Sequence, residues 1–161
     1  MIEVEKISLR PAAEADDSFL LSVYASTRAE EMERVPWSHE QKNAFLAMQF
    51  TAQKEHYAAL YPVARHDIIY LDQMPVGRLY RAWTGEALHI PDITILPQYR
   101  SSGIGSFVLR RAMQEAAMKG MPVTIYVETF NPSLRLFERL QFQKAEEKGI
   151  HYLMKWLPPA R

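Results

Sequence analysis

The middle of the chain carries a succession of patterns that restricts the fold to a narrow class. Residues 88–96 are mostly apolar or β-branched, and a loop with Gly103 and Gly105 follows them. The next stretch, up to residue 119, repeats its apolar side chains at helical spacing. The run 123–127 is almost unbroken in apolar residues, which is typical of a strand buried on both faces. Strand, glycine loop, helix and strand predict a βαβ unit.

Pro91 interrupts the first strand of this unit. Proline has no N–H to donate to a ladder of hydrogen bonds, so within sheets it is confined to edges and bulges. We therefore expect a β-bulge near Pro91, which would change how the rest of the strand pairs with its neighbours.

The first third of the chain predicts one strand and two helices. Residues 7–10 alternate as a short strand, and an apolar helical pattern follows over 19–24. Ser38 and Gln41 have the spacing of a capping box, in which each side chain satisfies a free backbone N–H at a helix start. Apolar residues continue at helical spacing as far as Pro62, so the second helix is long.

A hairpin and a C-terminal helix with two strands complete the expected elements. The segments 67–71 and 76–80 flank a tight turn and predict the hairpin. Asn131 is a good N-cap and Pro132 is the residue best tolerated at the first helical position, so a short helix is expected to begin there. The two closing strands are expected from Phe142 onward and over Ile150–Trp156.

Charge and cysteine content exclude several classes of function. Lys plus Arg number 19 and Asp plus Glu number 19, so no global field favours a nucleic acid or an anionic membrane. The absence of cysteine excludes disulfides, thiolate metal sites and a cysteine nucleophile. No signal-peptide pattern and no apolar run of about 18 residues is present. We expect a cytoplasmic protein with one domain over residues 1–161.

The loop PQYRSSGIGSF, residues 97–107, has the properties of an anion site. Amides at a helix N-terminus lack intrahelical partners and lie at the positive end of the helix dipole. Gly103 and Gly105 remove side chains that would hold a phosphate away from those amides, and Arg100 adds positive charge. The alternative is a structural turn in which glycine only permits a positive φ angle.

Two common phosphate-binding motifs do not match this loop. A nucleoside-triphosphate P-loop requires Lys and then Ser or Thr after the last glycine, where this chain has Ser106 and Phe107. A dinucleotide fingerprint requires a third glycine at position 108, which is valine. It also requires an acidic residue at the end of the next strand, for which Glu128 is a poor substitute.

Two motifs together resemble the GCN5-related N-acetyltransferase (GNAT) family. The string 93–105 matches the family's pyrophosphate loop, Gln/Arg-x-x-Gly-x-Gly/Ala, and 131–142 matches its Asn…Leu-Tyr-Glu-x-Leu-Gly-Phe helix. The resemblance covers 67–156 closely and the first 66 residues only by pattern. It implies an α/β (α+β) fold with a central mixed, mostly antiparallel twisted sheet of about six to seven strands and about four flanking helices. The sheet would be splayed between its fourth and fifth strands.

The resemblance also implies acetyl-coenzyme A as cosubstrate, held between strands 88–96 and 123–127. Its pyrophosphate would contact the loop amides, and its pantetheine arm would pair with the backbone of Ile93 and Ile95, which the bulge leaves open. Asn131 would touch the coenzyme as well as cap its helix. The cofactor-binding residues implied in this way are Ile93, Ile95, Arg100, Ser101, Ser102, Gly103, Ile104, Gly105, Ser106, Asn131 and Phe137.

The family's reaction is direct acetyl transfer to a primary amine, without a metal. An N–H near Ile95 would stabilise the developing oxyanion. A base must take the amine proton, and the candidates are His89, Asp92 and Glu128. Each of the three has an alternative role, as a half-exposed strand histidine, a bulge carboxylate or a solvated strand end.

The group that protonates the departing thiolate is less evident. The family's acid is the tyrosine of Leu-Tyr-Glu, and this position is Phe137, which has no proton to donate. Tyr126 is one substitute. Otherwise the thiolate leaves unaided, since a thiol's ordinary pKa is about 8.5, or catalysis has been lost. In the last case the protein is a non-catalytic acyl-coenzyme A-binding module.

The resemblance further implies that the acceptor faces the connection between the first two helices. Glu30 and Glu31 would attract a cationic amine there, with Trp37 or Tyr57 as a wall, although such an acidic run is commonly a solvated surface. The acceptor would be a small amine, or a lysine or N-terminal amine of a protein. No nucleic acid or membrane partner is expected, and a homodimer through the final strands is possible.

Overall fold

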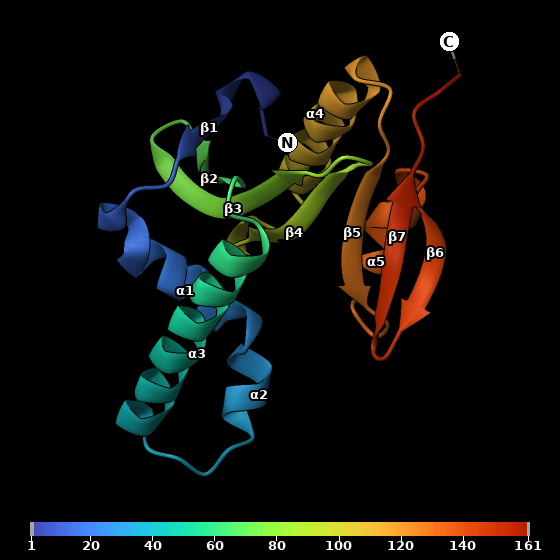
Figure 1. Cartoon of the computed structure of the whole chain (residues 1–161). Helices are drawn as coiled ribbons and strands as arrows, with labels where there is room; N and C mark the ends of the chain where they lie inside the picture. The colour runs from blue at the N-terminus through green and yellow to red at the C-terminus, as the bar shows by residue number, and fades with distance from the viewer. Residues whose placement is uncertain (1, 161) are drawn as a thin grey trace.

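The computed structural model describes residues 2–160, which form one mixed seven-stranded sheet with helices on both faces (Figure 1). The strand order is β1-β2-β3-β4-β5-β7-β6. The expected mixed, mostly antiparallel sheet is therefore confirmed. The strands are β1 (Ile7–Pro11), β2 (Arg65–Leu71), β3 (Met74–Trp83), β4 (Leu88–Ile95), β5 (Val123–Glu128), β6 (Gln143–Lys148) and β7 (His151–Trp156).

Strands β4 and β5 form a parallel pair in the centre of this sheet, and the other five neighbouring pairs are antiparallel. The parallel pairing extends only from Leu88, opposite Val123, to Ile90, opposite Ile125. Beyond Ile90 the two strands diverge, as their ribbons show (Figure 1). The splay predicted between the fourth and fifth strands is present.

A bulge in β4 lies where the splay begins. Tyr80 of β3 pairs with Asp92, and Ala82 pairs with His89, so two steps along β3 oppose three steps along β4. The extra residue changes the alternation of side chains, which places both His89 and Asp92 on the face covered by α3. The bulge expected near Pro91 is confirmed.

Helices cover both faces of the sheet and bury two hydrophobic clusters. The cluster under α1 and α3 includes Leu20, Phe50 and Ile68. The larger cluster, under α4 and α5, includes Leu79 and Leu109. The helices are α1 (Asp17–Thr27), α2 (Ala29–Glu33), α3 (His39–Leu60), α4 (Ile104–Met118) and α5 (Leu134–Arg139). None of the helices within residues 2–160 has the length and apolar character needed to cross a membrane.

Of the predicted starts of α3 and α5, the first is confirmed and the second is wrong. The capping box before α3 is present: the Gln41 N–H donates to Ser38 Oγ at 3.1 Å, and the Ser38 N–H donates to Gln41 Oε1 at 2.9 Å. The prediction that α5 begins at Pro132 is wrong, because the helix begins at Leu134. The Ser133 N–H donates to Asn131 Oδ1 at 2.9 Å, so the asparagine holds a turn ahead of the helix.

Candidate active site

The edge of β4 that faces β5 carries main-chain groups that are not paired with another strand within residues 2–160. The Leu96 N–H donates to Val76 O of β3 at 2.8 Å, and in an antiparallel ladder every second residue is directed the same way. The residues between, Ile93 and Ile95, therefore direct their N–H and C=O groups away from β3. On that side the pairing with β5 has already ended at Ile90. The result is an open strand edge inside the sheet.

Gly77 of β3 allows the backbone of β3 to lie close against the other edge of β4. A Cβ built on Gly77 would lie 2.3 Å from the carbonyl oxygen of Thr94, so any other residue would push the two strands apart. Glycine inside a strand indicates such a close backbone approach. The lone glycine within the strand 76–80 is the sequence signal for this close approach.

The glycine loop connects the open strand to α4. Gly103 is the N-cap of α4 and has φ +93°, and Ser101 also has a positive φ, +59°. No hydrogen bond from the amides of Ser101, Ser102 or Gly103 is found within residues 2–160. The next amides, at the start of α4, have no intrahelical acceptor. The loop thus presents donors at the positive end of a helix dipole.

The two glycines of this loop are there for different reasons. Gly103 is explained by its left-handed backbone, which is the structural alternative considered above. Gly105 has no positive φ, and a Cβ built on it would be 3.8 Å from Leu136 and 3.9 Å from Ile95, an ordinary packing distance. Neither backbone conformation nor crowding within the protein requires glycine at position 105. The missing side chain would lie between Ile95 of the open strand and Leu136 of α5.

Arg100 contacts the open strand edge. Its Nε donates to the carbonyl oxygen of Ile95 at 3.1 Å, and the residue is exposed. Arg100, which was expected to bind the pyrophosphate, therefore occupies the Ile95 carbonyl that was assigned to the pantetheine arm.

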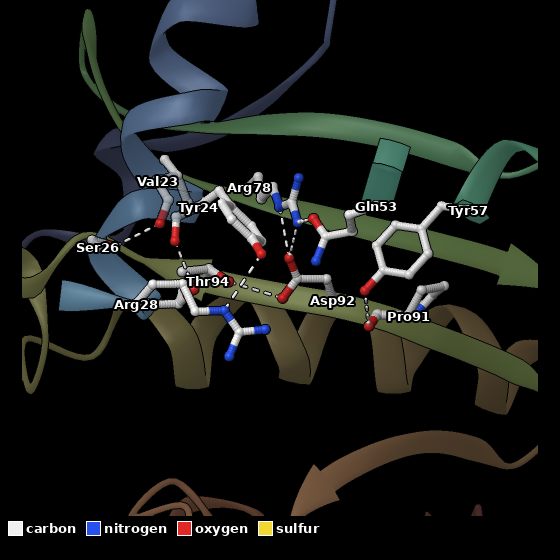
Figure 2. Close-up of polar contacts among 11 residues, drawn as sticks. Val23, Tyr24, Ser26, Arg28, Gln53, Tyr57, Arg78, Pro91, Asp92 and Thr94 are labelled. Atoms are coloured by element: carbon white, nitrogen blue, oxygen red, sulfur yellow. Dashed lines mark hydrogen bonds and ion pairs between the residues drawn. The ribbon is translucent and has the colours of Figure 1, made fainter. Parts of the chain in front are cut away.

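Asp92, one of the three candidate bases, is held in an ion pair. Its Oδ2 accepts from Arg78 Nε at 2.6 Å, and its Oδ1 accepts from Thr94 Oγ1 at 2.8 Å (Figure 2). Arg78 is buried and also donates to Gln53 of α3 at 2.6 Å. The carboxylate therefore balances a buried cation.

His89, the second candidate, lies at the end of the parallel pairing. Its Nδ1 shares a hydrogen bond with Thr124 Oγ1 of β5 at 2.9 Å. Its ring lies between Tyr61 and Tyr126, with ring centroids at 5.6 and 5.5 Å. Burial lowers the pKa of His89, so the imidazole is neutral at pH 7 and able to accept a proton.

Glu128, the third candidate, ends β5 on the same face of the sheet as Tyr126, two residues earlier. Within the described chain its carboxylate forms no hydrogen bond and no ion pair, and the residue is half-buried. Of the three candidates it is the one whose charge is not already balanced.

The two residues considered for the acid role have very different surroundings. Phe137 is 3% exposed and packs edge to face on Phe142, with the ring centroids 5.5 Å apart. Its side chain belongs to the core under α5 and has almost no accessible surface. Tyr126 is 43% exposed, and its hydroxyl makes no hydrogen bond to any other described residue.

The residues proposed for the acceptor are not all brought together. Trp37 packs on Phe45 near the start of α3, with ring centroids 5.2 Å apart. Tyr57 lies twelve residues further along the helix, about 18 Å at 1.5 Å per residue. Glu30 and Glu31 lie on α2, where Glu31 pairs with Arg28 at 3.1 Å and both acids are exposed.

Tyr57 is the one acceptor candidate that lies beside the candidate bases. Its hydroxyl donates to the carbonyl oxygen of Pro91 at 3.4 Å (Figure 2). Its ring lies 5.1 Å from that of Tyr80. Burial, with the nearby Asp92, raises the pKa of Tyr57 to about 12, so its hydroxyl keeps its proton at pH 7.

A mixed sheet that opens between its two parallel strands, followed by a glycine loop and a helix, defines the class of fold expected from the two sequence motifs. The family model described as "Acetyltransferase (GNAT) family" matches residues 22–142, which is more than half of the chain. The protein belongs to this family.

Among curated proteins, thialysine N-epsilon-acetyltransferase from Mus musculus is 38% identical over 42 residues. The match spans 26% of this chain and only 25% of that relative. The same enzyme from Sus scrofa matches to the same extent.

Solved structures resemble the chain over nearly its whole length. PaiA N-acetyltransferase from Thermoplasma acidophilum, in complex with coenzyme A, has a TM-score of 0.70 at 16% identity, covering 94% of this chain and 98% of that one. Spermidine N-acetyltransferase from Vibrio cholerae, in complex with coenzyme A and spermine, has a TM-score of 0.66 at 16% identity, covering 95% and 96%. At these identities the structures establish the fold.

Proposed function

We propose that the protein is an acetyl-coenzyme A-dependent N-acetyltransferase whose acceptor is a primary amine. The observation that carries this proposal is the open edge of β4, where Ile93 and Ile95 direct main-chain groups toward the separated β5. Family membership supports it, as do two similar structures that are complexes with coenzyme A. We also propose that residues 1–161 act as one domain.

The residues present fit acetyl-coenzyme A. An extended arm with amide groups is matched by the main-chain groups of Ile93 and Ile95 that are directed away from β3. A pyrophosphate is matched by the free amides that begin at Ser101, beside the bare position at Gly105. When bound, the cosubstrate supplies an acetyl thioester, which is the electrophile of the reaction. Arg100 would leave the Ile95 carbonyl to admit the arm.

His89 is the group we assign to proton removal from the amine. It lies where β4 and β5 part, and its lowered pKa keeps it neutral at pH 7. Glu128 attracts the amine as an ammonium ion. The Ile95 N–H, which points toward β5, stabilises the negative charge on the carbonyl oxygen during attack.

Thiolate departure does not involve position 137, because Phe137 is buried and carries no acidic proton. We assign the proton transfer to Tyr126, whose exposed hydroxyl has no partner among the described residues. The thiol's ordinary pKa of about 8.5 makes this step undemanding.

Two measurements test the proposed function. The first is thermal unfolding with coenzyme A, where a ligand at a hundred times its Kd adds about 2.7 kcal/mol to the free energy of unfolding. The second is thiol release from acetyl-coenzyme A with a panel of primary amines. Stabilisation together with amine-dependent thiol release is expected. Stabilisation without turnover on any amine would instead identify a non-catalytic binding module, and an unchanged melting temperature would contradict both.

A further inference from the structure

Six aromatic side chains form a continuous row on the face of the sheet that α3 covers. The row, named here the aromatic belt, crosses from β2 through β3, α3 and β4 to β5. Successive ring centroids are 4.8, 5.1, 6.4, 5.6 and 5.5 Å apart, within the range of interacting aromatic pairs. In order, its members are His66, Tyr80, Tyr57, Tyr61, His89 and Tyr126.

The belt ends beside the proposed acetyl-transfer point. Tyr126 is the first residue of β5 beyond the stretch paired with β4, and it is 43% exposed. At this end of the belt, the hydroxyls of Tyr61 and Tyr126 make no hydrogen bond to another residue in 2–160, and both residues retain exposed surface. A molecule lying along this end of the belt would contact ring faces and unengaged hydroxyls.

The belt is uncharged at neutral pH. Burial lowers the pKa of both of its histidines, that of His66 to about 4. The cation beside it, Arg78, is paired with Asp92. Lys54, three residues before Tyr57 in α3, is paired with Asp17 at 3.0 Å. At the open end, Glu128 forms no ion pair with any residue of the described chain.

Such a surface favours one kind of amine. Ring faces attract both apolar groups and a single ammonium ion. A second charge on the acceptor would lose water without gaining a partner, which is costly.

We propose that the acceptor is a primary monoamine with an aromatic or apolar body, which lies on the aromatic belt while its amino group lies between Glu128 and His89. This proposal rests on the proposed acetyltransferase function. It excludes as preferred acceptors the polyamines and free lysine, whose additional charges the belt does not balance.

The test compares kcat/KM for 2-phenylethylamine, spermidine and lysine with the full chain and acetyl-coenzyme A. We expect 2-phenylethylamine to exceed the other two by at least about tenfold, the equivalent of one or two aromatic contacts. A preference for spermidine or lysine would overturn the proposal. Acetylation without preference would overturn it too, while leaving the proposed acetyltransferase function intact.

Substitutions at Tyr126 separate recognition from chemistry. Tyr126→Leu removes the ring and is expected to raise KM for 2-phenylethylamine, reducing its advantage over spermidine at least about threefold. Tyr126→Phe keeps the ring and is expected to preserve that advantage even if kcat falls. The control is Trp83→Leu, which removes an aromatic of similar exposure that contacts Lys119 beyond the end of α4, on the opposite face of the sheet.

Stabilisation by coenzyme A and the substrate ratios together separate a failure of the acceptor proposal from a failure of the proposed function. The stabilisation by coenzyme A is expected to be the same in wild type and all three variants, which shows that each variant is folded and binds the cosubstrate. Equal substrate ratios in wild type and Tyr126→Leu would overturn the role of the belt. The absence of stabilisation in the wild type would overturn the proposed function itself, and with it the acceptor proposal.

Discussion

Arg78 and Asp92 lie side by side on β3 and β4 and form an ion pair, with Arg78 Nε donating to Asp92 Oδ2 at 2.6 Å. Arg78 is 3% exposed, so its charge depends on this partner and on Gln53 of α3 (Figure 2). The pair fixes α3 to the sheet directly after the bulge. Asp92, a candidate base in the sequence, thus also serves as the counter-ion of a buried cation.

We predict that Asp92→Asn lowers the free energy of unfolding by about 3 kcal/mol, because it leaves a buried cation without its counter-charge. Urea denaturation measures this change. The remaining turnover of the folded fraction is expected to be close to wild type when activity is assayed well below the denaturation midpoint. A variant of unchanged stability that has lost turnover would instead identify Asp92 as the base.

His89 makes a contrasting prediction for catalysis. His89→Gln removes the imidazole that would accept the amine proton where β4 and β5 part. The variant is therefore expected to lower kcat about 10²- to 10⁴-fold. Stabilisation by coenzyme A is expected to persist. In the wild type, kcat/KM should rise with pH. The rise should be steeper below the lowered pKa of His89, where both His89 and the amine must lose a proton, than above it, where only the amine must. Full activity of His89→Gln would transfer the base role to Glu128.

His66 makes the stability of the fold depend on pH. Its pKa is lowered to about 4, chiefly by burial and by nearby Arg78, and its buried Nε2 has no hydrogen-bond partner among residues 2–160. Between pH 6.5 and about 4 the unfolded chain binds a proton that the folded chain does not, so stability falls as the pH falls through this window. Since the ring keeps some contact with solvent, we expect a loss of about 2 kcal/mol.

The control for this effect is His66→Phe, which keeps a ring against Tyr80 but cannot titrate. Denaturation curves at pH 7 and pH 4.5 are compared for both proteins. The variant is expected to lose less stability than the wild type over this interval. Equal losses would show that other groups cause the acid sensitivity.

The two loop glycines predict opposite outcomes. Gly103→Ala forces a side chain into a left-handed backbone and is expected to destabilise the fold by about 1 kcal/mol. Gly105→Val is expected to leave the melting temperature within a few degrees of wild type but to weaken coenzyme A binding at least tenfold, about 1.4 kcal/mol. Isothermal titration measures the affinity, with Gly85→Val as the control in open space. Unchanged affinity of Gly105→Val would contradict the assignment of the loop.

Local patterns in the sequence predicted the elements that local physics determines. The capping box at Ser38, the bulge at Pro91 and the glycine loop each depend on neighbours a few residues apart. The start of α5 was misplaced because Asn131 also satisfies a turn, a competing hydrogen bond that composition does not distinguish from a helix cap.

The parts of the site that depend on distant residues could not be predicted. The partner of Asp92 is fourteen positions away on another strand, and the aromatic belt combines residues from five elements. The acceptor wall, Trp37 or Tyr57, was predicted from the family resemblance, which placed the acceptor at the connection between the first two helices. The length of α3 separates Trp37 from Tyr57, so helix geometry decided which of the two lies beside His89.

The single additional residue in β4 has a consequence for how this fold tolerates insertions and deletions. Side chains alternate along a strand, so removing one residue between His89 and Asp92 would exchange the two faces for everything downstream. Asp92 and Thr94 would turn into the apolar layer beneath α4, and Ile93 would meet Arg78. The length of this short segment is therefore under tighter constraint than its composition.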